Sequence, residues 1–297
     1  MTTMREQMAL TATALFRDDP RVAIVLAEIS TDYFRDVFAH DPARAVNVGI
    51  MEQTMVGVAA GFAMEGFLPL VHTIAPFLAE RALEQIKVDF GYQELEGTFA
   101  TVGASYDYTA EGFTHHAPAD VQEMLAVPRM EVVVPGTASE LDRLFRATYA
   151  DGHPTYLRTS ARENATSRSV EFGKVDVLRR GADATVVAVG PMLDPTIAAV
   201  EGMDVTVLYV TTVGPFDADG LAREAADAPE VIDVTPFLEG TLTPALTTGL
   251  AHRPARFASI GVSRDPLRTY GTPVDHDRER GLDVEGIRAR IERFLEG

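Results

Sequence analysis

A change of hydrophobic period between residues 45 and 63 constrains this chain more than any other feature. Residues 45–48 form a short apolar run that ends at Gly49, as a buried strand does. Good helix formers follow from Met51 onward, and Glu52 stands in the first turn of the expected helix. The helix dipole favours the charged form of a carboxylate at that position. The pattern therefore predicts a strand–helix junction that carries a single carboxylate.

The expected helix has very little side-chain bulk along part of its length. Gly57 and Gly61 each cost about 1 kcal/mol relative to alanine in a helix interior, and Ala59 and Ala60 lie between them. A close approach by another element or another chain is the compensation we favour. We expect a partner to pack on this helix.

Strand and helix patterns alternate along the whole chain. Strands are expected at residues 22–27, 45–48, 68–74, 98–102, 131–134, 156–158, 184–189, 205–210, 231–234 and 255–260, and helices at 1–20, 51–63, 76–90, 120–126, 137–150, 191–201, 217–228 and 284–295. Thr137 and Glu140 have the spacing of a capping box. This alternation predicts an α/β fold with two domains, each a mainly parallel sheet flanked by helices.

The hydrophobic pattern lapses between about residues 160 and 181. We therefore place one domain at residues 1–165, a linker at 166–180 and a second domain at 181–297.

Charge and cysteine content exclude several classes of function. The 297 residues hold 26 lysines and arginines against 44 acidic residues, a net charge of −18 that would repel nucleic acid. No cysteine is present, which removes thiol nucleophiles and thiolate metal sites. No signal peptide or membrane-spanning run is recognised, so we expect no membrane association and a cytoplasmic location.

Polar residues gather where several expected strands end. Glu28 follows the strand at 22–27, and a long loop at 103–118 holds Glu111, His115 and His116. The carboxyl ends of parallel strands are where open sheets bind ligands. His72 lies within a strand, so both a core position and a cleft position stay open for it.

These residues also carry a resemblance to the transketolase family over residues 20–165. The matching segments are Gly49-Ile50-Met51-Glu52-Gln53, Met55-Val56-Gly57-Val58-Ala59-Ala60-Gly61, Thr73-Ile74-Ala75-Pro76-Phe77-Leu78, Ala110-Glu111-Gly112-Phe113-Thr114-His115 and Tyr156-Leu157-Arg158-Thr159-Ser160. The second half resembles the family's C-terminal domain more weakly, in Gly190-Pro191, Gly214-Pro215-Phe216-Asp217 and Tyr270-Gly271-Thr272. The resemblance implies a pyrimidine-binding domain followed by a transketolase C-terminal-like domain.

For the cofactor, the resemblance implies that Glu52 hydrogen-bonds the aminopyrimidine ring of thiamine diphosphate and assists its activation, a form of acid–base catalysis. Phe77 matches an aromatic residue that packs on the pyrimidine, and Ile74 replaces a second one. Glu28 is assigned to the same cofactor site. His115 is retained from the family's catalytic loop.

The substrate end departs from the family pattern. The aspartate of the catalytic loop becomes Glu111, and an extra histidine, His116, joins His115 as a catalytic candidate. Arg162 is a counterpart of the phosphate-binding arginine, displaced by one residue, and Arg158 competes with it; His72 completes the candidate substrate residues. These departures favour a small-molecule substrate other than the ordinary pentose phosphates, with transfer of a ketol or acyl unit.

The sequence contains no Gly-Asp-Gly, the family motif that holds the diphosphate through Mg²⁺. We therefore expect a split enzyme, in which a separate subunit with that motif holds the diphosphate and Mg²⁺, and the two chains form an α2β2 heterotetramer. No metal ligand is assigned to the present chain. Two alternatives stay open: a β subunit of a 2-oxo-acid dehydrogenase, and a structural or regulatory partner without catalytic activity.

Overall fold

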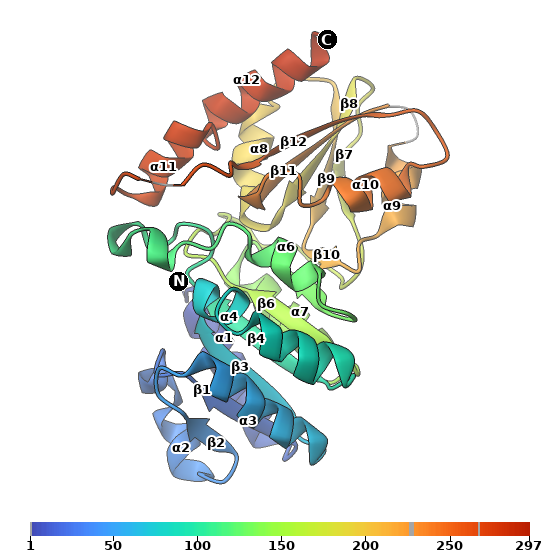
Figure 1. The fold of residues 1–297 in the computed structure, drawn as a ribbon. Coiled ribbons are helices and arrows are strands. Elements are labelled where there is room, and N and C mark those ends of the chain that lie inside the picture. The colour runs from blue at the N-terminus through green and yellow to red at the C-terminus, as the bar shows by residue number, and fades with distance from the viewer. Residues whose placement is uncertain (1, 226–228, 267) are drawn as a thin grey trace.

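The computed structural model describes residues 2–225, 229–266 and 268–297. It contains two sheets, each flanked by helices, which lie one above the other in Figure 1. The α/β fold with two mainly parallel sheets is confirmed. None of the described helices is both long and apolar enough to cross a bilayer.

The first sheet is seven-stranded, in the order β10-β5-β6-β4-β3-β1-β2. Its strands are β1 (Val22–Leu26), β2 (Ala45–Asn47), β3 (Leu68–Ile74), β4 (Gly97–Val102), β5 (Glu131–Val133), β6 (Pro154–Arg158) and β10 (Thr212–Gly214). All pairs are parallel except that of β10 with β5. The carboxyl ends of β1 to β4, where the polar candidate residues follow, therefore lie at one edge of the sheet.

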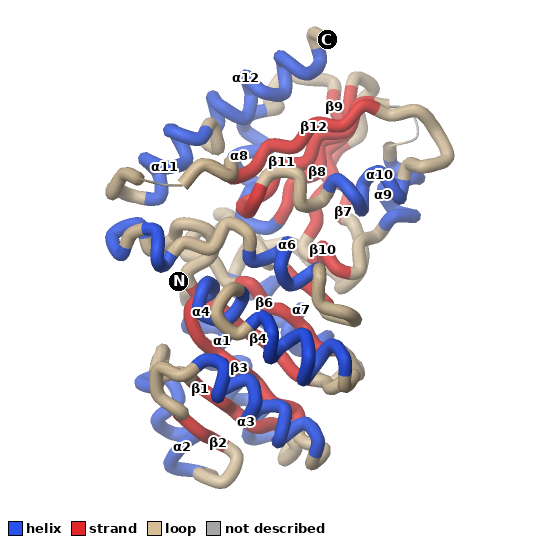
Figure 2. The backbone as a smooth tube through the Cα atoms, in the orientation of Figure 1, coloured by secondary structure: helices blue, strands red, loops and turns tan. Residues whose placement is uncertain are grey.

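Helices cover both faces of this sheet (Figure 2). They are α1 (Met4–Asp18), α2 (Arg35–His40), α3 (Glu52–Met64), α4 (Ala75–Ala79), α5 (Leu83–Gln85), α6 (Asp120–Leu125) and α7 (Ala138–Thr148). Met8, Phe16 and Leu144 lie in the apolar cluster beneath α1 and α7. Met55 and Val56 of α3 lie in a second cluster, which continues into the other half of the chain through Val187.

The second sheet is five-stranded, in the order β12-β11-β8-β9-β7. Its strands are β7 (Asp176–Arg179), β8 (Ala184–Val189), β9 (Val205–Val210), β11 (Glu230–Leu238) and β12 (Arg256–Val262), and only β7 is antiparallel to its neighbour. The helices of this half are α8 (Leu193–Ala199), α9 (Ala218–Glu224), α10 (Thr243–Gly249), α11 (Pro273–Arg280) and α12 (Val284–Leu295).

Two observed strands lie where the sequence predicts none. β7 lies inside the segment 166–180 expected as a linker, and β10 returns from the second half to extend the first sheet. The division into domains at 165 and 181 stays a prediction.

Three expected helices differ from the observed ones. The helix expected at 76–90 is interrupted after α4 and resumes as α5, which leads into a π-helical segment, Ile86–Tyr92. The helix expected at 191–201 begins as a 3₁₀ turn, Gly190–Met192. The end of the helix expected at 217–228 lies outside the described residues, and its observed part is α9.

The predicted capping box at Thr137 is half correct. The Thr137 side chain accepts a hydrogen bond from the Glu140 backbone N–H, but the Glu140 carboxylate does not return to Thr137. It accepts instead from the Gly136 N–H at 2.8 Å and from the Tyr209 hydroxyl at 2.7 Å. Tyr209 belongs to β9, so this buried carboxylate joins the two halves.

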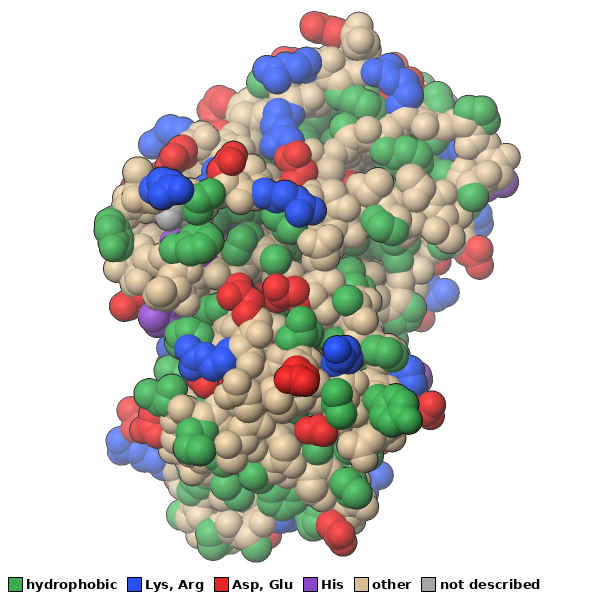
Figure 3. All heavy atoms as spheres, in the orientation of Figure 1, with side chains coloured by type: hydrophobic (Ala, Val, Ile, Leu, Met, Phe, Trp, Pro, Cys, Tyr) green, Lys and Arg blue, Asp and Glu red, His purple; other side chains and the backbone are tan. Residues whose placement is uncertain are grey.

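The charged side chains of both signs are interspersed over the face of the molecule in Figure 3, with hydrophobic side chains between them. On this face the acidic side chains are therefore not gathered into one patch.

Candidate active site

The predicted cofactor residues come from the carboxyl ends of neighbouring strands in the first sheet. Glu52 begins α3 shortly after β2, and Phe77 lies on α4, which follows β3 directly. His115 ends a 3₁₀ turn, Phe113–His115, in the loop after β4. Because these strands are parallel, the three side chains meet at one edge.

Glu52 is buried, with 1% of its surface exposed. Its Oε2 accepts a hydrogen bond from Arg81 Nη1 at 2.7 Å. The Arg81 guanidinium lies 4.1 Å from the centroid of the Phe77 ring, and the Phe77 and His115 rings meet edge to face at 5.0 Å. A carboxylate, a guanidinium, an aromatic ring and an imidazole therefore form one continuous group.

Arg81 was missed by the sequence analysis, although it stands one helical turn after Phe77. It lies in the turn that interrupts the helix expected at 76–90, and this turn brings its side chain to Glu52. The Arg81 side chain is 40% exposed, whereas that of Glu52 is 2% exposed. The arginine is therefore partly open to solvent, whereas the carboxylate is shielded from it.

Ile74 and Glu28 flank this group. Ile74 ends β3 and is buried; a Cβ at Gly103 would come 3.0 Å from its side chain and 2.5 Å from the Tyr108 ring. Tyr108 therefore packs against Gly103, and a larger side chain at that position would collide with its ring. Glu28 is exposed and accepts a hydrogen bond from the Asn47 side chain at 3.1 Å.

Asn47 is a second residue that the sequence analysis missed. Its Oδ1 accepts hydrogen bonds from the backbone N–H groups of Glu28 and Gly49, both at 3.0 Å. Asn47 thus fixes the turn that leads into Glu52.

His115 and His116 face different surroundings. His116 is buried, and its ring lies 6.1 Å from Phe113 and 6.2 Å from His276 of the second half. Burial and the nearby His276 lower the pKa of His116. Glu111 is exposed on the preceding turn. The structure therefore brings His115 to Phe77 and places His116 at the contact between the halves.

A family model described as "Transketolase, pyrimidine binding domain" matches residues 1–166, more than half of the chain and including Glu52, Phe77 and His115. The chain belongs to the transketolase family.

Three similar proteins extend this finding. An uncharacterised 33.6 kDa protein of the fasciation locus of Rhodococcoides fascians is 40% identical over 99% of this chain and 95% of its own length. The 6-deoxy-6-sulfo-D-fructose transketolase subunit of Clostridium sp. (strain MSTE9) is 33% identical over 73% of this chain and 70% of its own length. A solved "split gene transketolase, inactive beta4 tetramer" is 26% identical, with a TM-score of 0.86 over 99% of this chain and 98% of its own.

In this transketolase-family chain, Arg158 is almost fully buried. Its Nε donates to Asp120 Oδ2 at 2.7 Å, and its Nη2 donates to Ser105 Oγ at 2.7 Å. Asp120 also accepts from the Tyr156 hydroxyl at 2.8 Å. Arg158 Nη1 is buried without a hydrogen-bond partner among the described residues. The ion pair with Asp120 anchors Arg158 and leaves one of its nitrogens available.

Arg158 and Arg162 line the same cavity, of about 330 Å³, between the two halves. Arg162 forms an ion pair with Asp277 of α11, and its Nη1 lies 3.0 Å from the Met192 sulfur. Burial raises the pKa of Asp107, which also lines the cavity, to about 6. The cavity thus combines two arginines with acidic and apolar walls.

His72 lies in the core of the first sheet. Its Nδ1 is 2.9 Å from the Ala100 carbonyl, and its Nε2 is 2.8 Å from Ser30 Oγ, which accepts a hydrogen bond from Arg5. Burial lowers the pKa of His72 to about 4. A neutral ring that donates from Nδ1 and accepts at Nε2 satisfies all these contacts, so His72 is held by the protein at both nitrogens.

Proposed function

We propose that this chain is the pyrimidine-binding subunit of a two-chain, thiamine diphosphate-dependent transketolase-like enzyme that transfers a two-carbon ketol or acyl unit. One observation carries the proposal: Glu52 is buried at the start of α3, beside Phe77, inside the region that matches the pyrimidine-binding family. The similar Clostridium protein is named as a transketolase subunit, and the similar solved structure comes from a split gene.

The residues at this edge fit an aminopyrimidine ring. Glu52 would hydrogen-bond a ring nitrogen and hold a proton there, since its carboxylate is shielded from water. The Phe77 face now covered by Arg81 offers a flat apolar surface, so Arg81 moves aside when the ring binds. Ile74 closes one side, and Glu28 supports the neighbouring turn. Thiamine diphosphate supplies the electron sink that stabilises a carbanion.

The proposed substrate is a small molecule that binds next to Phe77. His115 is proposed to exchange a proton with it; the support is that its ring lies beside Phe77, with the two centroids 5.0 Å apart. Arg158 and Arg162 suit an acidic group, a phosphate or a carboxylate, at the far end of the substrate. His116 and Glu111 lie in the same loop as His115 and are proposed as further residues on the substrate side of the site.

His72 is proposed to act without touching the substrate, because both of its ring nitrogens already contact groups of the protein. Its place among the substrate residues is to support the Ser30 turn next to Glu28 rather than to contact the substrate.

A separate subunit with a Gly-Asp-Gly motif is proposed to hold the diphosphate through Mg²⁺, in an α2β2 heterotetramer in the cytoplasm. The small-residue helix α3 offers a surface for it. A Cβ added at Gly57 or at Gly61 would meet no atom within 4 Å, so both glycines face open space rather than this chain's own core. Close approach of another chain explains why two helix-interior glycines are present.

Cofactor binding by the reconstituted complex tests this proposal. The chain is mixed with a Gly-Asp-Gly subunit from the same genome, thiamine diphosphate and Mg²⁺, and near-ultraviolet circular dichroism of the aminopyrimidine is recorded. We expect a new cofactor band that is lost in Glu52→Ala and kept in Glu65→Ala, an exposed control just beyond the end of α3. Absence of any cofactor signal in the unaltered complex would favour a structural or regulatory subunit instead.

A further inference from the structure

A second group of titratable side chains lies at the opposite edge of the first sheet. Glu131 is the first residue of β5, and Asp151 and His153 immediately precede β6. Glu131 and Thr155 are register partners, so the two parallel strands begin side by side. The group is therefore at the amino ends of these strands, away from the carboxyl ends that carry Glu52.

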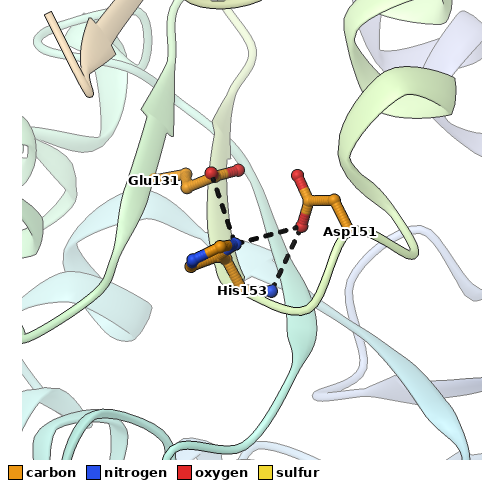
Figure 4. Close-up of side chains that lie close together, drawn as sticks. All are labelled: Glu131, Asp151 and His153. Atoms are coloured by element: carbon orange, nitrogen blue, oxygen red, sulfur yellow. Dashed lines mark hydrogen bonds and ion pairs between the residues drawn. The ribbon is translucent and has the colours of Figure 1, made fainter.

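The three side chains converge on one point. His153 Nδ1 lies 3.7 Å from Glu131 Oε1 and 3.8 Å from Asp151 Oδ1. One ligand atom from each residue falls within 4.8 Å of the others. Figure 4 shows the two carboxylates pointing toward the His153 ring from different sides.

These separations suit a transition-metal ion. Nitrogen and oxygen ligands bind Zn²⁺ at about 2.0–2.2 Å in a tetrahedron, which places neighbouring ligand atoms roughly 3.4 Å apart. The observed separations between the ring nitrogen and the two carboxylates exceed that value by a few tenths of an ångström. Side-chain rotation alone can close such a gap.

The turn that carries Asp151 and His153 is already held in place. Its middle residue, Gly152, has a left-handed backbone with φ of 91°. The Gly152 carbonyl accepts a hydrogen bond from Arg129 at 2.6 Å, and its N–H donates to Glu96 at 2.8 Å. Two side chains from outside the group thus fix the turn, so a bound ion meets preorganised ligands.

Among the described residues, no lysine or arginine forms an ion pair with the two carboxylates of the group. The Glu131 side chain is 9% exposed, and the ion pairs of Glu131 and Asp151 among the described residues are with His153. The Thr155 hydroxyl donates a hydrogen bond to Glu131 Oε2 at 3.3 Å. Asp151 Oδ1 also accepts a hydrogen bond from the backbone N–H of His153 at 3.1 Å, which holds this carboxylate beside the ring.

We propose that Glu131, Asp151 and His153 bind one divalent transition-metal ion of the Zn²⁺ class, with water completing the coordination. An imidazole together with two carboxylates favours Zn²⁺ over Mg²⁺, which prefers oxygen ligands and retains its waters. The ion neutralises the two carboxylates and ties the amino end of β5 to the turn before β6. The sequence does not reveal this group, because Glu131 is twenty residues before Asp151 and meets it only where β5 and β6 pair.

Zinc titration of the metal-free full-length chain tests the site. Isothermal calorimetry with Zn²⁺ alone is expected to show saturable binding of one ion per chain, and Zn²⁺ is expected to raise the unfolding temperature by mass action. His153→Ala and Asp151→Asn should each weaken binding at least tenfold. Both residues lie on the surface turn, and circular dichroism verifies that the variants fold. His252→Ala removes an exposed histidine elsewhere and should bind like the unaltered chain.

Three outcomes would overturn the assignment. They are the absence of saturable zinc binding, equal zinc affinity in the unaltered chain and in His153→Ala, which means an adventitious ion only, and binding of Mg²⁺ in preference to Zn²⁺. None of them depends on the cofactor chemistry at Glu52.

Discussion

Replacing Asp120 by asparagine should destabilise this protein strongly. Asp120 and Arg158 are 0% and 1% exposed, and their ion pair is supported by the Tyr156 hydroxyl on the same carboxylate oxygen. The asparagine side chain would offer no negative charge, so Arg158 would stay buried without the carboxylate that it hydrogen-bonds. Removal of one partner from such a buried pair costs about 3–5 kcal/mol, which corresponds to a fall of about 6–10 °C in the unfolding temperature for a chain of this size.

The assay is thermal unfolding followed by far-ultraviolet circular dichroism. Asp32→Asn is the matched control, because its ion pair with Arg35 is about four-fifths exposed on both sides and should shift the midpoint by less than about 2 °C. A shift for Asp120→Asn as small as that of the control would refute the reasoning. Arg158 would then lack the structural anchoring described here.

The remaining predictions concern His72 and the ion pair at the active site. The pKa of His72 is about 4 in the folded chain, so the unfolded chain takes up a proton first as the pH falls below 6.5. About 3 kcal/mol of stability should be lost between pH 6.5 and 4, and pH-dependent unfolding of His72→Asn should show a smaller loss. A double-mutant cycle of Arg81→Ala and Glu52→Ala, read by urea unfolding, should give a coupling energy of about 1–2 kcal/mol; additive effects would contradict the ion pair.

Local pattern accounts for much of the fold. The change of period at residues 45–63 correctly predicts β2 and α3, and the closing helix at 284–295 agrees with α12 at both ends. In these segments, the spacing of the apolar residues and the local preference of the backbone favour the same secondary structure. The α/β fold class could be predicted for the same reason: when strand and helix patterns alternate along a sequence, few arrangements other than parallel sheets flanked by helices are possible.

Contacts between distant residues account for what the sequence did not predict. Strand β10 pairs with β5 across about eighty residues, and neither segment carries a local sign of that pairing. Glu140 has the spacing of a capping box, yet its carboxylate bonds Tyr209 of the other half. Arg81 could be noticed one turn after Phe77, but its contact with Glu52 depends on the interruption after α4.

The central claim is that the Glu52 carboxylate is required for a transketolase-like reaction. The rate of transfer of the two-carbon unit is measured in the complex of this chain with its Gly-Asp-Gly subunit, thiamine diphosphate and Mg²⁺. The unaltered chain is compared with Glu52→Ala and with the control Glu65→Ala. We predict that kcat falls at least about 100-fold in Glu52→Ala alone, the scale of a lost acid–base group. Full activity in Glu52→Ala would contradict the account.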